Sequence, residues 1–252
     1  MPSGLKGLGQ PRQRGVAFND GISLGMPNLL QFPLDPFSRR VRLALAEYGV
    51  AFNLIEERPW TPSQKLFDLN PAGVVPVFVE EGGAAVSGIE AITEYLEETR
   101  AESVSLIPGP ASARAEVRRL AGWFDTKFYA EVSEPIITEK IIRRFMTRET
   151  GGGAPDMARV RYGLSRLRDH LEYLGTLADH RSWLAGEELS IADLSAAAHL
   201  SVIDYLGDVP WADFPVAKRW YQRIKSRPSF RPLLADTLRG MPPLASYADL
   251  DF

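Results

Sequence analysis

The spacing of apolar residues changes character along the chain, and its first part predicts short strands mixed with helices. A short apolar strand is predicted from Leu29, Leu30 and Phe32, and it ends at Pro33. Val41, Leu45 and Tyr48 then recur at i, i+4 and i+7, which predicts an amphipathic helix. Gly49 supplies a stop signal for this helix. Three arginines lie off its apolar face: Arg39, Arg40 and Arg42.

The residues that follow predict a second strand, a hairpin and another helix. Phe52 and Leu54 alternate with polar neighbours, as in a half-buried strand. Residues 75–86 are interrupted by a Gly-Gly pair and predict an antiparallel hairpin. Residues 89–98 predict a helix with one apolar side. This order is typical of a small α/β domain with a mixed sheet, which we place at 26–103.

The remainder of the chain predicts an all-helical domain. Residues 104–111 contain a Pro-Gly-Pro stretch and indicate a linker. Helical patterns follow at about 111–129, 132–148, 156–178, 190–206 and 215–226, within a domain placed at 112–238. Residues 239–252 form a predicted C-terminal tail. Residues 1–25 are rich in Gly, Gln, Arg and Ser without a period, and we expect them to be disordered or an over-extended start.

Composition excludes several classes of function. A formal net charge of −3 argues against non-specific nucleic-acid binding. The absence of cysteine removes disulfides, thiolate metal sites and a cysteine nucleophile. No apolar run is long enough to cross a bilayer, and residues 1–25 lack the features of a secretory signal. We therefore predict a cytoplasmic protein with neither membrane nor nucleic acid as a partner.

Several separated motifs point to one family. They are the Val75-Pro76 pair, the S/T-x-x-D sequence Ser190-Ile191-Ala192-Asp193, and the segments HLSVIDYLGDVPW and RIKSRPSF. With these motifs the stretch from Met26 to Leu234 resembles the cytosolic glutathione transferase superfamily. The resemblance implies a thioredoxin-like α/β N-terminal domain and an all-α C-terminal domain. It also implies that Val75-Pro76 is a cis-proline site whose edge binds the glutathione backbone, with glutathione as a substrate rather than a cofactor.

The Ser190/Asp193 pair has a local explanation. The Ser190 side chain can cap the backbone N–H of Asp193, whose carboxylate can accept from the N–H of Ser190. We interpret this pair as a folding device with no role in catalysis.

One departure from the family pattern concerns thiol activation. In relatives with an x-Pro-Phe turn, the residue before Pro-Phe carries the group that lowers the pKa of the glutathione thiol. Asp35 occupies that position here. An ionised carboxylate would repel a thiolate, and a protonated one could donate only after a large upward pKa shift. Ser38, one turn further along, is the nearest substitute, and Asp35 could instead favour a cationic ligand.

A second departure concerns the seat of the glutathione γ-glutamyl carboxylate. Aligning Ala91-Ile92 with the Ala-Ile of the family places Gly88-Ile89 where an acidic residue and Ser would stand. Residues 87–90 instead match a capping box, in which Ser87 and Glu90 satisfy the helix start. The alternative is a one-residue shift in which Ser87 acts as the ligand.

No other chemistry is indicated. His170, His180 and His199 are isolated, without the spacing of a metal site or a triad, so no metal is predicted. His199 lies in an Ala-rich stretch and is interpreted as a packing residue.

Three features are candidates for recognition, each with a structural alternative. Trp60 lies in a predicted loop and either packs on that loop or contacts a partner. Lys140, Arg143, Arg144 and Arg148 share a helical stretch, as a solvated face or as a basic patch for an acidic partner or an anionic substrate. The terminal residues Asp249, Leu250, Asp251 and Phe252 alternate acidic and apolar groups, and either pack back on the helical domain or dock into another protein.

These departures, Trp60 and the terminal sequence together resemble a narrower group, the glutathione-transferase-like FtsZ-binding proteins of α-proteobacteria. Membership would imply a non-catalytic homodimer that binds and curves FtsZ filaments at the division site. The alternative is a working glutathione transferase, with Ser38 or Asp35 near the sulfur and with Val75, Pro76 and Ser87 holding the peptide.

Overall fold

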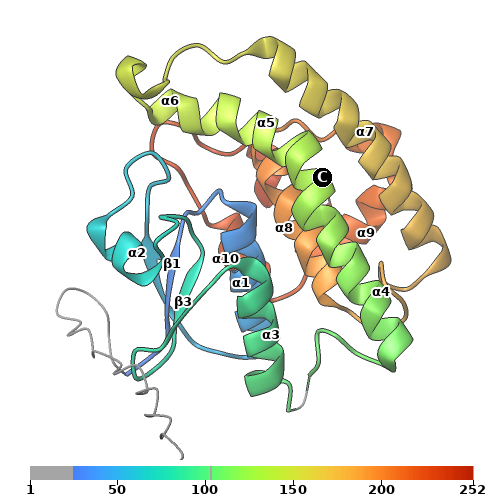
Figure 1. Cartoon of the computed structure of the whole chain (residues 1–252). Coiled ribbons are helices and arrows are strands. Elements are labelled where there is room, and N and C mark those ends of the chain that lie inside the picture. Colours follow the sequence, from blue (N-terminus) through green and yellow to red (C-terminus); the bar gives the residue numbers. More distant parts are fainter. Residues whose placement is uncertain (1–24, 103, 252) are drawn as a thin grey trace, which may run out of the picture.

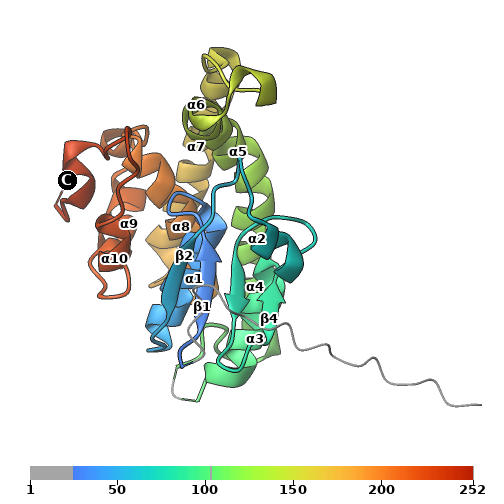
Figure 2. The same ribbon diagram turned by 90° about the vertical axis from the view of Figure 1, so that its left-hand side faces the viewer.

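The structure is a computed structural model that describes residues 25–102 and 104–251. An α/β domain and a helical domain pack side by side (Figures 1 and 2). The prediction for residues 1–25 falls almost wholly outside the described residues, as does Phe252. No helix within the described ranges combines the length and the apolar character that crossing a bilayer needs.

A mixed four-stranded sheet forms the centre of the α/β domain, in the order β2-β1-β3-β4. Its strands are β1 (Asn28–Gln31), β2 (Asn53–Glu56), β3 (Val77–Val79) and β4 (Ala85–Ser87). β2 runs parallel to β1, β3 runs antiparallel to it, and β3 and β4 form the predicted hairpin. The predicted β-α-β, hairpin and helix order is confirmed.

Alternation along the strands separates two apolar layers. On one face Leu29 and Phe78 pack with α1 (Pro36–Glu47) and α3 (Ile89–Arg100). On the other face Leu30 and Val77 pack with Leu66 of the short helix α2 (Gln64–Leu69), which the sequence patterns did not predict. Gly49, with φ of 70°, directly follows the C-cap of α1, as expected.

The helical domain begins with one long run, where the sequence predicted two helices. The run comprises α4 (Ala111–Gly122), the π-helical η1 (Trp123–Ser133), α5 (Glu134–Ile137), η2 (Thr138–Ile142) and α6 (Arg143–Phe145). The predicted break near residue 130 is therefore wrong. Pro135 lies inside the run and has no backbone N–H to donate to the preceding turn. The π-helical turns on either side of α5 shift the hydrogen-bond register around it, so the helical run continues.

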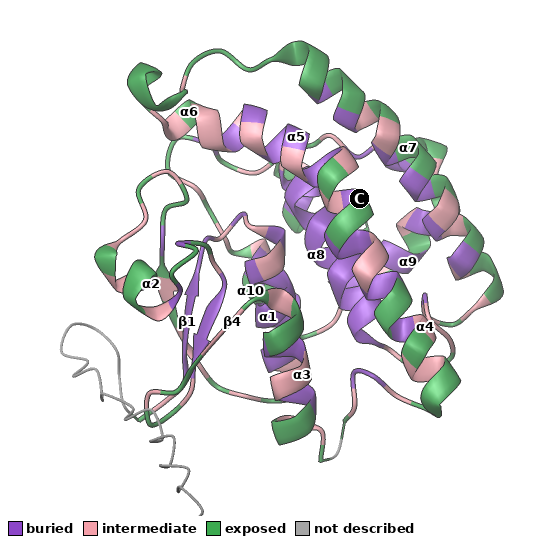
Figure 3. Cartoon of the chain, in the orientation of Figure 1, coloured by how far each residue is buried: buried purple, intermediate pink, exposed green. Residues whose placement is uncertain are grey.

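The remaining elements complete the bundle around a buried helix. They are η3 (Arg148–Thr150), α7 (Met157–His180), α8 (Ile191–Tyr205), η4 (Trp211–Asp213), α9 (Pro215–Lys225), α10 (Arg231–Leu234) and η5 (Ala245–Ala248). Every residue of α8 is buried (Figure 3). The predicted capping box begins this helix, since the Ser190 N–H donates to the Asp193 carboxylate at 3.1 Å. His199 is buried in α8 with its Nδ1 2.8 Å from Ser133 Oγ, which confirms a packing role.

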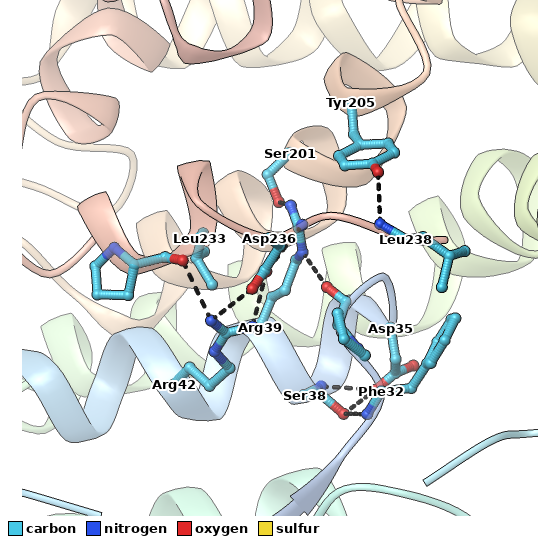
Figure 4. Close-up of polar contacts among 12 residues, drawn as sticks. Phe32, Asp35, Ser38, Arg39, Arg42, Ser201, Tyr205, Leu233, Asp236 and Leu238 are labelled. Atoms are coloured by element: carbon cyan, nitrogen blue, oxygen red, sulfur yellow. Dashed lines mark hydrogen bonds and ion pairs between the residues drawn. The ribbon is translucent and has the colours of Figure 1, made fainter. Parts of the chain in front are cut away.

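Helix α1 packs against α8, and this contact joins the two domains. The three arginines off the apolar face of α1 are consequently buried. Arg39 is fully enclosed and donates to Ser201 Oγ at 2.8 Å and to Asp236 Oδ2 at 3.2 Å (Figure 4). Arg40 forms a buried ion pair with Asp125. The apolar core extends without interruption from the sheet through α1 into the helical bundle.

Candidate functional site

A cavity of about 440 Å³ lies between the two domains. The α/β domain contributes the segment after β1, the loop after β2, the turn before β3 and the start of α3, while the helical domain contributes the run from η1 to η2. The lining residues are Phe32, Leu34, Asp35, Pro36, Phe37, Glu57, Pro59, Leu66, Gly73, Val74, Val75, Pro76, Gly88, Ile89, Tyr129, Glu134, Ile137, Thr138 and Ile142. Its size and mostly apolar walls are those of a small-molecule site.

Val75 and Pro76 are the residues to which the family resemblance assigned a peptide-binding edge. The bond between them is cis, as expected from the motif, and both residues line the cavity. β3 begins directly after them at Val77.

Asp35 caps α1 rather than pointing freely at a substrate. Its Oδ2 accepts from both the backbone N–H and the hydroxyl of Ser38, each at 2.7 Å (Figure 4). Burial raises the pKa of Asp35 to about 6, although the Ser38 hydrogen bonds act in the opposite direction. The carboxylate therefore carries most of its negative charge at neutral pH, at the position where a thiolate would need a donor.

Ser38 is not presented to the cavity. Its side chain is fully buried, and its hydroxyl accepts from the Phe32 N–H at 3.3 Å while donating to Asp35. A hydroxyl held in this way has no proton to offer a substrate sulfur. This geometry counts against the sequence-based alternative that Ser38 replaces the missing thiol-activating group.

The start of α3 differs from the predicted capping box. Ser87 belongs to β4, where it pairs with Val77, and the N-cap of α3 is Gly88 with no side-chain cap. Gly88 has φ of 88°, a conformation that turns the strand directly into the helix and suits glycine. Strand pairing therefore places Ser87 one residue too early to cap the helix. Gly88 and Ile89 line the cavity, so the first turn of α3 begins at its wall.

The charge of the lining is acidic. Asp35, Glu57 and Glu134 are lining residues, and the described lining includes neither lysine nor arginine. Glu57 accepts from Ser63, and Glu134 forms an ion pair with Arg159 at 2.7 Å. Burial, together with the charges of Asp35 and Glu134, raises the pKa of Tyr129. Sequence reasoning missed Glu57, Tyr129 and Glu134, because they lie in no local motif and meet only when the domains pack.

Trp60 contacts the opposite domain instead of its own loop. Its ring packs edge-on against Phe32, with centroids 5.5 Å apart, and stacks on Phe145 of α6 at 5.1 Å. The side chain is half-buried within this apolar cluster. Trp60 thus joins the loop after β2 to the end of the long helical run.

The predicted basic patch is divided by internal ion pairs. Lys140 binds both carboxylate oxygens of Asp208, at 2.7 and 2.6 Å. Arg143 pairs with Glu139 at 3.0 Å. Arg144 is exposed and donates to the backbone carbonyl of Gly240 at 2.9 Å. The four cations therefore do not form one free surface. Of the four, Arg144 and Arg148 are exposed.

The C-terminal tail packs back at one point and is exposed beyond it. Tyr247 is buried, and its hydroxyl accepts from Arg39 at 2.8 Å and donates to the Leu233 carbonyl at 3.3 Å. Asp249, Leu250 and Asp251 follow as exposed residues. The alternative in which the tail packs back on the protein therefore holds for η5, whereas docking of the exposed end into another protein stays a prediction.

Comparison with known proteins agrees with this architecture. The model of the glutathione S-transferase N-terminal domain matches residues 36–99, and that of the C-terminal domain matches residues 136–228. FtsZ-localized protein A of Caulobacter vibrioides is 49% identical over 89% of this chain and 97% of its own. The solved structure of FzlA from C. crescentus has a TM-score of 0.85 at 48% identity, covering 90% of this chain and 100% of that one.

A further solved structure, described as a glutathione S-transferase from Sinorhizobium meliloti, is 49% identical with a TM-score of 0.87. It covers 90% of this chain and 100% of its own. The predicted fold, a thioredoxin-like domain followed by an all-α domain, is confirmed by these matches. The chain belongs to the glutathione S-transferase family.

Proposed function

We propose that this protein is a non-catalytic adaptor with a glutathione transferase fold, which binds FtsZ filaments and regulates bacterial cytokinesis. The observation that carries the proposal is the 49% identity with FtsZ-localized protein A, which extends over 97% of that protein. We further propose that the protein is a cytoplasmic homodimer recruited to the division site.

The interdomain cavity supports a role without catalysis. Thiolate formation needs a donor near the sulfur, and Asp35 places a mostly ionised carboxylate at that position. Ser38 is enclosed and its proton is committed to Asp35. Neither residue is arranged to lower the pKa of a bound thiol.

The exposed tail supports a role in partner binding. Tyr247 fixes the chain to α1 through Arg39, so Asp249, Leu250 and Asp251 leave the surface from a defined point. A short anchored segment loses less conformational entropy on binding than a free one. We therefore propose these residues, with Phe252, as part of the contact with FtsZ, together with Trp60 and the Lys140, Arg143 and Arg144 cluster.

Co-sedimentation with polymerised FtsZ tests this proposal. Asp249→Lys should lower the fraction of protein that pellets without changing the melting temperature, because Asp249 is exposed. Glu172→Lys reverses an exposed charge on α7 and serves as the matched control. Equal pelleting of wild type and Asp249→Lys would remove the tail from the contact.

A glutathione transferase remains the second candidate, because the scaffold of the binding site is retained. The cis bond between Val75 and Pro76 borders the cavity, and the first turn of α3 has no side-chain cap from Ser87. The N–H groups of that turn are therefore not satisfied by a capping box and could bind an anionic group. Calorimetric titration with glutathione separates the candidates, since micromolar affinity would favour the enzyme.

A further inference from the structure

A second hollow lies on the helical domain, away from the interdomain cavity. It has a volume of about 410 Å³ and lies between the end of the long helical run, the end of α8 and the segment 241–244. The C-terminal segment runs beside α6 here (Figure 1), where Arg144 donates to the Gly240 carbonyl at 2.9 Å. We call this hollow the tail groove, with Lys140, Arg144, Leu206, Met241 and Leu244 among its lining residues.

One side of the tail groove is cationic. The charge of Lys140 is balanced by Asp208, but the partner of Arg144 is an uncharged carbonyl. Arg239 is exposed and directly precedes Gly240 in the chain. Within residues 25–102 and 104–251, neither Arg144 nor Arg239 has a carboxylate at ion-pair distance. The region therefore presents uncompensated positive charge on a protein whose net charge is −3.

The other side is apolar and held in place. Leu244 is 49% exposed, a large value for a leucine that lines a groove, and Leu206 is half-buried beside it. The Leu244 N–H donates to the Tyr205 carbonyl at 3.0 Å, and the Tyr205 hydroxyl donates to the Met241 carbonyl at 2.5 Å. These bonds fix the backbone of the apolar side, so its shape exists before any ligand binds.

We infer that the tail groove is a docking site for an acidic peptide segment that carries one leucine-sized apolar side chain. The apolar side chain would cover Leu244 and Leu206, while flanking carboxylates would meet Arg144 and its neighbours. The inference deepens the proposed function and rests on it for the identity of the partner, so the segment would belong to FtsZ. A long polyanion is disfavoured by the net negative charge of the whole chain.

Fluorescence anisotropy with a labelled synthetic peptide, Asp-Glu-Leu-Asp-Glu, tests the groove directly. We expect saturable binding that weakens as salt is raised. Arg144→Glu and Leu244→Ser should each weaken binding about tenfold. Replacing the central leucine of the peptide by serine should weaken it similarly. Arg161→Glu, an equal charge change at an exposed position on α7, should leave it unchanged.

Both groove substitutions are at exposed positions, so unchanged melting temperatures will show that the variants fold. The inference is overturned if the peptide does not bind, if neither groove variant weakens binding, or if the serine peptide binds equally well. Co-sedimentation with FtsZ then separates the two proposals. If the groove variants pellet with FtsZ as well as the wild type does, only the docking site is overturned. If the wild-type protein itself stays in the supernatant, the proposed function is overturned, and the peptide assay alone decides whether the groove binds.

Discussion

Replacing Asp35 by asparagine should stabilise the protein at neutral pH. The folded state raises the pKa of this carboxyl from 3.8 to about 6, mainly because it is buried. Between these values the folded protein binds more protons than the unfolded chain, so stability falls as pH rises and the loss is complete above about pH 6. A tenfold change in proton affinity equals about 1.4 kcal/mol, so the ionised carboxylate costs at most about 3 kcal/mol.

Asparagine should remove this cost while keeping the cap of α1. Only Oδ2 of Asp35 accepts the two Ser38 hydrogen bonds, and the single amide oxygen of asparagine can accept the same pair. We expect Asp35→Asn to raise the free energy of unfolding by about 1–3 kcal/mol at about pH 8, with little difference at about pH 4.

Urea unfolding followed by tryptophan fluorescence at both pH values measures this difference. Asp251→Asn removes an exposed carboxylate and should have little effect at either pH. An Asp35→Asn variant that is equally or less stable than wild type at the higher pH would refute the reasoning. It would mean that the hydrogen bonds of the ionised carboxylate to Ser38 stabilise the fold by more than the burial of its charge destabilises it.

Two single contacts and the interdomain cavity give three further predictions. Tyr247→Phe removes the hydroxyl that joins the tail to Arg39, so it should cost about 1–3 kcal/mol and speed hydrogen exchange in residues 245–251, as measured by mass spectrometry. Asp125→Ala leaves the Arg40 guanidinium buried without its carboxylate and should cost about 3–5 kcal/mol in urea unfolding. Titration with millimolar glutathione should release no heat, and micromolar affinity would contradict the non-catalytic account.

Elements set by local signals were predictable. The apolar spacing of α1, the Gly-Gly turn between β3 and β4, and the Ser190/Asp193 capping box each depend on residues a few positions apart. The cis bond at Val75-Pro76 was predicted from the family resemblance. These features carry most of the fold.

Contacts between distant segments were not predictable in the same way. The arginines of α1 are buried because their partners, such as Asp236 for Arg42, lie 194 residues away. Nothing in the helical spacing of Lys140 indicates that Asp208 neutralises it. Residues 87–90 match the sequence of a capping box, but Ser87 does not cap α3. Its pairing with β3 holds it in strand β4, one residue before the N-cap.

The central claim is that this protein acts by binding FtsZ through its surface and not by glutathione chemistry in the interdomain cavity. Co-sedimentation with polymerised FtsZ, with and without millimolar glutathione, tests this claim most directly. The account predicts that the wild-type protein pellets saturably with the filaments and that glutathione leaves the pelleted fraction unchanged. Protein that stays in the supernatant with and without glutathione would contradict it.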